Sequence, residues 1–400
     1  MTDRDRQMLQ PNYTEKEGKL FTGRISYIKQ IDEALAKKNT VAVIAHSGFG
    51  RVSLLKHIAS QRGHLYLDLR KFSLSPENLA VELIGTICFS NLAKSFSELP
   101  KYQNIEGLKG LKLGKKCSDI IRTVDNELQK IKPDQVLLLS SAFSFAEEFA
   151  AEQKKKTTIT INNFEELLKL NNFSQVKDAL GIFFGAASKA KSCSFIVSSS
   201  AVHTMKSALK KHVTDIIELS PLSPDETREL FEKIAGKTDA RVTKEVHELS
   251  AGIPRIVTSI ASRFRDEQSA DVQKNIKLVK YILVSELATI TSPSYFYCSK
   301  LFTNSLNRAR GESLLKAILK AVSQNRPLRL TEIARLIYRS GPVTKSLLER
   351  LMEVDLIVKR DGTFDFANPV LKLWCRMMFS NVEFNETPDE DSLAKLGGLL

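Results

Sequence analysis

A glycine-rich turn between an apolar segment and a helix-forming segment is the part of this sequence best suited to chemistry. It reads VAVIAHSGFGRVSLL over residues 41–55. In a phosphate-binding loop the glycines let backbone N–H groups face phosphate, a lysine reaches the terminal phosphates, and a serine or threonine hydroxyl binds Mg²⁺. Gly48 and Gly50 are present here, but Arg51 and Val52 stand at the lysine and hydroxyl positions. The helix N-terminus can still attract an anion, whereas an arginine does not simply replace a lysine ammonium.

A second motif that could do chemistry is the pair Asn162 and Asn163, which follows the apolar segment TTITI at 157–161. Hydrolytic sites of this kind need an acidic pair there, to hold Mg²⁺ and to orient water. An asparagine lacks the charge that a hard cation needs, and it cannot accept a proton at neutral pH. Glu165 and Glu166 follow too late, on what we expect to be the next helix. A plain turn would explain two asparagines alone, but the joint loss of lysine, hydroxyl and both carboxylates indicates a nucleotide site without its hydrolytic groups.

The elements that must position these residues alternate between strands and helices. We expect strands at 41–45, 64–70, 157–161, 194–200 and 213–219, with a helix after the glycine turn that stops at Gly63. Strand–helix–strand repeats pair in parallel through right-handed crossovers. The predicted fold class is therefore α/β with a doubly wound parallel sheet, which binds ligands at the carboxyl ends of its strands.

The rest of the chain predicts two further domains. Helical patterns with strong caps follow from Ser223 to about 290, and three short amphipathic helices with a hairpin at Asp361-Gly362 follow from about 310. Three helices plus a hairpin predict a winged helix. We expect these units: a flexible N-terminus at 1–20, the α/β core at 21–222, a helical lid at 223–295, a winged-helix domain at 296–382 and an acidic, mobile tail at 383–400.

The third helix of the predicted winged helix, PVTKSLLERLMEVD, decides whether that domain reads DNA or docks on protein. We expect Val343, Leu347, Leu348 and Leu351 to form its core stripe, with Thr344, Lys345, Glu349 and Arg350 facing outward. The candidate nucleic-acid contacts are Arg339, Lys345, Lys359 and Arg360, diluted by Glu349 and Asp361. The alternative is that these are ordinary solvated positions on a module that packs against the core or a partner.

Composition limits the function classes. The chain has 400 residues, 42% hydrophobic content and a net charge of +13, which makes an anionic partner plausible. No apolar run approaches the roughly 18 to 20 residues that span a bilayer, so we expect a cytoplasmic protein without a membrane partner. The five cysteines are widely spaced with no ligand pattern, which favours simple thiols over a metal site.

Several segments together carry a family resemblance. FTGRISYIKQIDEAL contains Gly23 and Arg24, FIVSSSAVHTM contains Ser199 and Ser200, AGIPRIV contains Arg255, and FANPVLKLWCRMM contains Asn368. In this order and spacing they resemble the prokaryotic, mainly archaeal, P-loop ATPases of the STAND type, which are related to AAA+ proteins of the origin-recognition kind and carry a C-terminal winged helix.

The resemblance implies ATP or ADP binding coupled to domain movement. Gly23 and Arg24 would lie near the adenine, Ser200 would lie on the first sensor strand, and Arg255 would act as a second sensor. The phosphate loop would comprise His46, Ser47, Gly48, Phe49, Gly50, Arg51, Val52 and Ser53.

Three functional hypotheses follow. The leading one is a regulatory or interaction module that binds ATP or ADP, holds Mg²⁺ poorly and does not hydrolyse nucleotide, since no catalytic residue is intact. The second is an active ATPase switch in which Arg51 contacts the phosphates and Glu165 serves the metal. The third is a winged-helix DNA-binding protein that works without nucleotide. A protein partner or a second copy of the chain is compatible with the first two.

Overall fold

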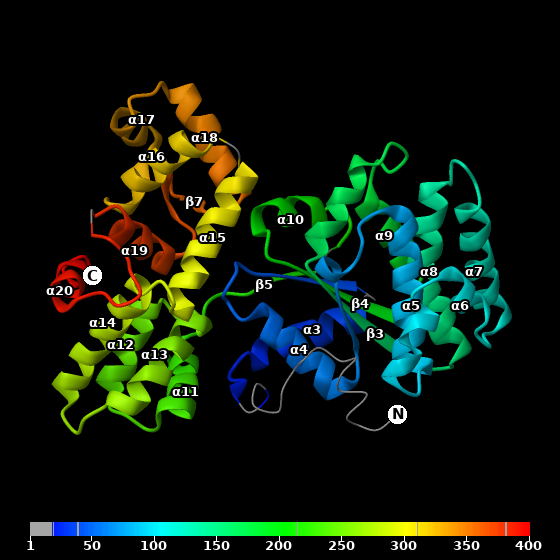
Figure 1. Cartoon of the computed structure of the whole chain (residues 1–400), viewed down its shortest axis with the longest axis horizontal. Helices are drawn as coiled ribbons and strands as arrows, with labels where there is room; N and C mark the ends of the chain where they lie inside the picture. The colour runs from blue at the N-terminus through cyan, green and yellow to red at the C-terminus, as the bar shows by residue number, and fades with distance from the viewer. Residues whose placement is uncertain (1–17, 19, 38–39, 214, 310, 381) are drawn as a thin grey trace.

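The computed structural model describes residues 18, 20–37, 40–213, 215–309, 311–380 and 382–400. The prediction for residues 1–20 falls outside this part of the chain, apart from residues 18 and 20. Figure 1 shows the sheet and its helices on one side and the helices α11 to α20 on the other. Within the described residues, no helix is long and apolar enough to cross a bilayer.

A parallel sheet forms the centre of the N-terminal half, as the sequence predicts. In the described residues it has five strands in the order β2-β3-β4-β1-β5. The strands are β1 (Thr40–Ile44), β2 (Leu65–Asp68), β3 (Thr157–Asn162), β4 (Cys193–Ser199) and β5 (Ile216–Glu218). The register pairs Ile44 with Ser199 and Asp68 with Asn162. The carboxyl ends of β1, β2, β3 and β4 therefore meet along one edge of the sheet.

Helices cover both faces of this sheet, which explains why its strands are nearly continuous apolar runs. On one face Val41 and Val43 belong to a core cluster shared with α3 (Ile25–Lys37) and α4 (Arg51–Arg62). On the other face Ala42 and Ile44 pack with α5 (Pro76–Leu92), α8 (Gln135–Glu152) and α9 (Ala179–Ala187). The alternation along β1 thus builds two cores, one on each side.

Smaller elements complete this half of the molecule. They are η1 (Leu69–Lys71), η2 (Phe96–Tyr102), α6 (Ile105–Lys109), α7 (Lys115–Leu128), η3 (Phe164–Asn172) and α10 (Val202–Leu209). The segment that carries Glu165 and Glu166 is thus a 3₁₀ helix. It starts from Asn163, which is left-handed at φ 55°, a conformation that asparagine tolerates better than most residues.

Five consecutive helices connect the sheet to the C-terminal end. They are α11 (Pro224–Ala235), α12 (Ala240–Ser250), α13 (Pro254–Glu267), α14 (Val272–Ala288) and α15 (Pro293–Ala309). α11 begins with a capping box between Ser223 and Glu226, which satisfies two orphan backbone donors. α15 runs between the C-terminal elements and the sheet (Figure 1).

The region from 312 to 378 combines helices with a small antiparallel sheet of order β6-β8-β7. Its elements are α16 (Glu312–Ser323), β6 (Leu328–Arg329), α17 (Leu330–Leu336), α18 (Gly341–Glu353), β7 (Ile357–Arg360), β8 (Thr363–Phe366) and α19 (Pro369–Met378). The strands β7 and β8 form the predicted hairpin, which turns at Asp361 and Gly362.

The predicted core stripe of α18 is wrong at its first residue. Thr344 is fully buried, whereas Val343 is 43% exposed. The buried set on α18 is Thr344, Leu347, Leu348 and Leu351, which follows the helical spacing i, i+3, i+4, i+7, and Val343 falls outside that stripe. Arg350, predicted to face outward, instead donates from Nε to the Ala309 carbonyl at 2.9 Å.

The predicted mobility of the acidic tail is also wrong for its last part. Residues Glu390–Gly397 form α20, and Leu393 and Leu396 on it are buried. The helix packs against α14. Two leucines at i and i+3 can bury one side of even a short helix, while the acidic residues stay in solvent.

Candidate functional site

The glycine turn between β1 and α4 adopts the conformation that its glycines allow. Gly48 and Gly50 both have a φ of 88°, a region that other residues rarely enter. Gly50 is the N-cap residue of α4. The free N–H groups at this helix start and the positive end of the helix dipole are suited to binding phosphate.

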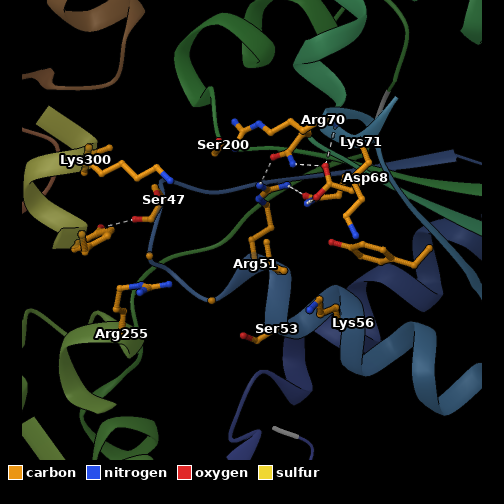
Figure 2. A pocket seen from close by; sticks show the side chains of 18 of the residues that line it. Ser47, Arg51, Ser53, Lys56, Asp68, Arg70, Lys71, Ser200, Arg255 and Lys300 are labelled. Carbon is orange, nitrogen blue, oxygen red and sulfur yellow. Dashed lines mark hydrogen bonds between the residues drawn. The ribbon is translucent and has the colours of Figure 1, made fainter. Parts of the chain in front are cut away.

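Arg51 lies in the first turn of α4, and its side chain crosses to the ends of two strands (Figure 2). Its Nη1 donates to Asn162 Oδ1 at 2.5 Å and to Ser198 Oγ at 2.7 Å. Its Nη2 lies 3.5 Å from Asn163 Oδ1. The residue is only 6% exposed. Arg51 therefore forms one buried cluster with the two asparagines, which lie 111 and 112 residues further along the sequence.

Asp68 at the end of β2 is the carboxylate nearest to this cluster in the hydrogen-bond network. It accepts from Asn163 Nδ2 at 2.6 Å, and its second oxygen lies 3.5 Å from Asn162 Nδ2. The two carboxamides thus stand between the guanidinium and the carboxylate. Burial lowers the pKa of Arg51, and the nearby Glu165 partly raises it again; an arginine stays protonated throughout.

The side chains around this cluster bear on the predicted weak binding of Mg²⁺. Val52 offers no oxygen, and Ser53 is exposed one position later on α4. Glu165 accepts from Ser200 Oγ at 3.3 Å and pairs with Arg70 at 3.4 Å. No group of three or more His, Cys, Asp or Glu side chains in the described residues could hold a metal ion. Divalent cations prefer carboxylate oxygens, whereas Arg51 contacts two amide oxygens here, and weak Mg²⁺ binding stays a prediction for this site.

A wide cleft of about 1750 Å³ opens in front of the glycine turn. Seven of the eight predicted loop residues line it, all except the buried Phe49, together with Ser200 and Arg255. Its lining includes more cations than carboxylates. The cations are Arg51, Lys56, Arg70, Lys71, Arg255, Arg263, Lys300 and Arg308, and the carboxylates are Asp68, Glu82 and Glu286. Such a cleft attracts anions.

Gly23 and Arg24 lie outside this cleft. They line a separate cavity of about 520 Å³ together with acidic residues of α11. The Arg24 N–H donates to Glu226 Oε1 at 2.8 Å, and its Nη2 donates to the Phe49 carbonyl at 2.9 Å. Arg24 therefore bonds to the backbone of the glycine turn without lining the cleft. Their predicted role near an adenine stays a prediction.

Tyr297 on α15 is a site residue that the sequence analysis missed. Its hydroxyl donates to the Ser47 carbonyl at 2.7 Å and accepts from Asn368 Nδ2 at 2.8 Å. A methyl group added at Gly48 would meet this hydroxyl at 2.4 Å. Arg255 lies over the Tyr297 ring at 5.7 Å. The glycine turn is thus tied directly to α15 and, through Asn368 at the start of α19, to the C-terminal elements.

A second contact between the two halves involves Asp355, which follows α18. Its Oδ1 accepts the His203 N–H at the start of α10 at 2.9 Å and lies 3.9 Å from His46 Nδ1. Burial raises the pKa of Asp355 to about 6. Burial lowers the pKa of His46, with Glu218 acting in the opposite direction.

The four candidate nucleic-acid residues are all exposed. Lys345 on α18 lies 3.9 Å from the carboxylate of Glu349, and Lys359 lies over the Phe364 ring at 5.7 Å. Arg339 precedes α18, and Arg360 ends β7. Their binding to DNA stays a prediction. It requires a duplex affinity that falls as the salt concentration rises and that disappears when Lys345, Lys359 and Arg360 are replaced.

Comparison with known proteins identifies the family. The family described as Novel STAND NTPase 1 matches residues 10–252, more than half of the chain. The chain belongs to the Novel STAND NTPase 1 family. A search of curated proteins found no match. The family membership confirms the predicted relation to P-loop ATPases of the STAND type and places the glycine turn in a nucleotide-binding fold.

Two solved structures are similar to this STAND NTPase family member over nearly the whole chain. A Walker-type ATPase of Pyrococcus abyssi has 18% identity and a TM-score of 0.64, and the match covers 89% of this chain and 96% of that chain. The ORC2 protein of Aeropyrum pernix, solved as ADPNP-ADP complexes, has 11% identity and a TM-score of 0.51, with 99% and 98% covered. Identities this low support a shared fold only.

Proposed function

We propose that this protein is a regulatory module that binds ATP or ADP and does not hydrolyse it. The observation that carries the proposal is a phosphate cradle without hydrolytic groups. Gly48, Gly50 and the start of α4 keep the backbone geometry for phosphate. Val52 and the two asparagines supply neither a metal ligand with charge nor a base that could take a proton from water.

The regulatory part of the proposal concerns residues 296–382, which we interpret as a winged helix behind a lid at 223–295. Tyr297 connects the glycine turn to Asn368, and Asp355 connects the start of α10 to the end of α18. Both contacts lie at the carboxyl edge of the sheet, where a ligand would bind. We therefore propose that nucleotide occupancy changes how this unit docks on the core.

Calorimetric titration with ATP and ADP in Mg²⁺ buffer, together with a phosphate-release assay on the same sample, tests the proposal. We expect binding with no turnover above the background of a sample without protein. Mg²⁺-dependent turnover near an ordinary enzyme rate, roughly 1 per second, would contradict the loss of hydrolysis. A flat titration with both nucleotides, in Mg²⁺ and in EDTA alike, would contradict the nucleotide site itself.

One observation favours a second candidate, the active switch. Glu165 Oε2 is buried and has no hydrogen-bond partner in the described structure, so one oxygen of this carboxylate is available. If Glu165 serves as a substitute base, Glu165→Gln abolishes turnover. Glu166→Gln is the matched control, because Glu166 lies on the same 3₁₀ helix and pairs with Arg70 and Lys169.

A further inference from the structure

Arg51 combines three properties that bear on ligand binding. The residue is 6% exposed. Every hydrogen-bond acceptor that it has in the described structure is neutral, namely the two carboxamide oxygens and the Ser198 hydroxyl. It also lines the cleft in front of the glycine turn. A buried charge without an anion in contact is unfavourable, so this arrangement favours an anionic ligand.

The two asparagines decide what the guanidinium can do. A carboxylate at 162 would form an ion pair with Arg51 and neutralise it inside the protein. A carboxamide satisfies the same N–H groups without bringing a negative charge into contact, and in the described structure Glu165 and Asp68 act on the guanidinium only at longer range. The nearest carboxylate in the network, Asp68, reaches the cluster only through the amide nitrogens of Asn162 and Asn163.

The guanidinium also lies where strands β3 and β4 end, which is the position that a metal ion needs in a hydrolytic site of this fold. Val52, Asn162 and Asn163 do not fit Mg²⁺, and a fixed cation beside them disfavours a second one by repulsion. The charge that Mg²⁺ would supply to phosphate is therefore already present in the side chain of Arg51.

We propose that Arg51 is the resident cation of this site, so that the protein binds ATP or ADP as metal-free anions. The inference deepens the proposed function and rests on it. Arg51 would act on the phosphates from the strand side, while the glycine turn binds them through its N–H groups. Arg255 and Lys300 reach toward the same turn from α13 and α15 (Figure 2) and would add charge at the cleft side.

The test is calorimetric titration of the full chain with ATP and with ADP, in EDTA and in excess Mg²⁺. We expect wild-type affinity in EDTA to equal or exceed the affinity in Mg²⁺, because Mg²⁺ removes negative charge from the nucleotide. Arg51→Met should weaken binding in EDTA by a factor on the order of ten or more. Asn162→Asp should do the same, since the new carboxylate pairs with the guanidinium.

Two further variants keep the test interpretable. Arg51→Lys retains the charge but not the fork, so it serves if Arg51→Met does not fold, and we expect it to bind several-fold more weakly in EDTA than the wild type. Arg376→Lys is the matched control, because Arg376 is a partly buried arginine that donates to the Ser323 and Leu399 carbonyls. It should bind like the wild type.

The outcomes separate this inference from the proposed function. Tight binding in EDTA that falls in the Arg51 and Asn162 variants supports the inference. Binding that requires Mg²⁺, or that Asn162→Asp strengthens in Mg²⁺, overturns it and leaves the proposed function standing. Binding in EDTA that no Arg51 variant changes also overturns it. The absence of binding under every condition overturns the proposed function and the inference together.

Discussion

Asp355 is a buried carboxylate whose ionisation the folded protein disfavours. Its side chain is 13% exposed, and it accepts a hydrogen bond from the His203 N–H. Burial raises its pKa from 3.8 to about 6, despite backbone hydrogen bonds that act in the opposite direction. The residue is left-handed, with a φ of 58°. We predict that Asp355→Asn stabilises the protein at neutral pH.

The sign and size follow from proton linkage. Between pH 3.8 and about 6 the folded chain binds this proton more tightly than the unfolded chain, so the free energy of unfolding falls as the pH rises through that range and stays level above it. Each pKa unit corresponds to about 1.4 kcal/mol, so a rise from 3.8 to about 6 corresponds to about 3 kcal/mol lost at pH 7.5. Asparagine keeps the acceptor oxygen and tolerates a left-handed backbone.

Urea unfolding at several pH values between 4 and 7.5 measures this effect. We expect Asp355→Asn to raise the free energy of unfolding by about 2 to 3 kcal/mol at pH 7.5 and to leave it almost unchanged near pH 4. Asp361→Asn is the matched control, because Asp361 is also left-handed but exposed. A variant that is less stable than the wild type at pH 7.5, or that keeps the wild-type slope between pH 4 and 6, would refute the reasoning.

Three other substitutions test the site and the tail. Tyr297→Phe should lower the free energy of unfolding by about 2 kcal/mol in urea, because it removes the bond to Ser47 and leaves the buried Asn368 amide without its partner. Gly48→Ala should lower it by about 1 to 3 kcal/mol by the same measurement, since alanine disfavours a φ of 88° and its methyl group meets the Tyr297 hydroxyl. Leu396→Ala should lower the free energy of unfolding by about 2 kcal/mol, because Leu396 is buried on α20. Calorimetric melting measures this loss, and an unchanged melting curve would mean that the tail is mobile.

The features that the sequence predicted well are those with local causes. The strands around 41–45 and 157–161 are apolar and β-branched, and the observed strands begin and end within one residue or so of the expected ones. The turn follows from the glycines at 48 and 50, whose positive φ values need no information from elsewhere in the chain. Periodicity also predicted the helices α11 to α14, since their caps stand in the sequence.

The contacts of Arg51 could not be predicted in the same way. One hypothesis placed its guanidinium on the phosphates, which stays a prediction, but no hypothesis included its bonds to Asn162 and Ser198. The sequence did indicate that Ser198 has a hydrogen-bond partner, because a polar residue inside the apolar strand SFIVSSS needs one. Nothing in the sequence indicated the contact between Asp68 and the two asparagines, since β2 and β3 are neighbours in the sheet but about ninety residues apart in sequence.

The contacts between the two halves depend wholly on tertiary packing. Tyr297 and Ser47 are 250 residues apart, and nothing in the local sequence of either residue indicates the other. The error at Val343 and Thr344 is of a different kind, because it concerns only the first residue of the stripe, where a buried residue and an exposed one are exchanged. Hydrophobicity favoured valine, but the spacing of Leu347, Leu348 and Leu351 fits Thr344.

Asp355 and the proposed nucleotide site act on the same junction in opposite directions. The cleft is lined by residues of α4 on one side and of α15 on the other, so a bound nucleotide contacts both halves and should stabilise their docking. A ligand at one hundred times its Kd stabilises the folded state by about 2.7 kcal/mol. The charge on Asp355 removes about 3 kcal/mol above pH 6. Saturated wild-type protein at pH 7.5 should therefore match ligand-free Asp355→Asn in urea. His46 lines the cleft and lies 3.9 Å from Asp355 Oδ1, so the stability of the saturated variant measures how far the two effects add. A saturated variant no more stable than either alone would mean that ligand and carboxylate act through one contact.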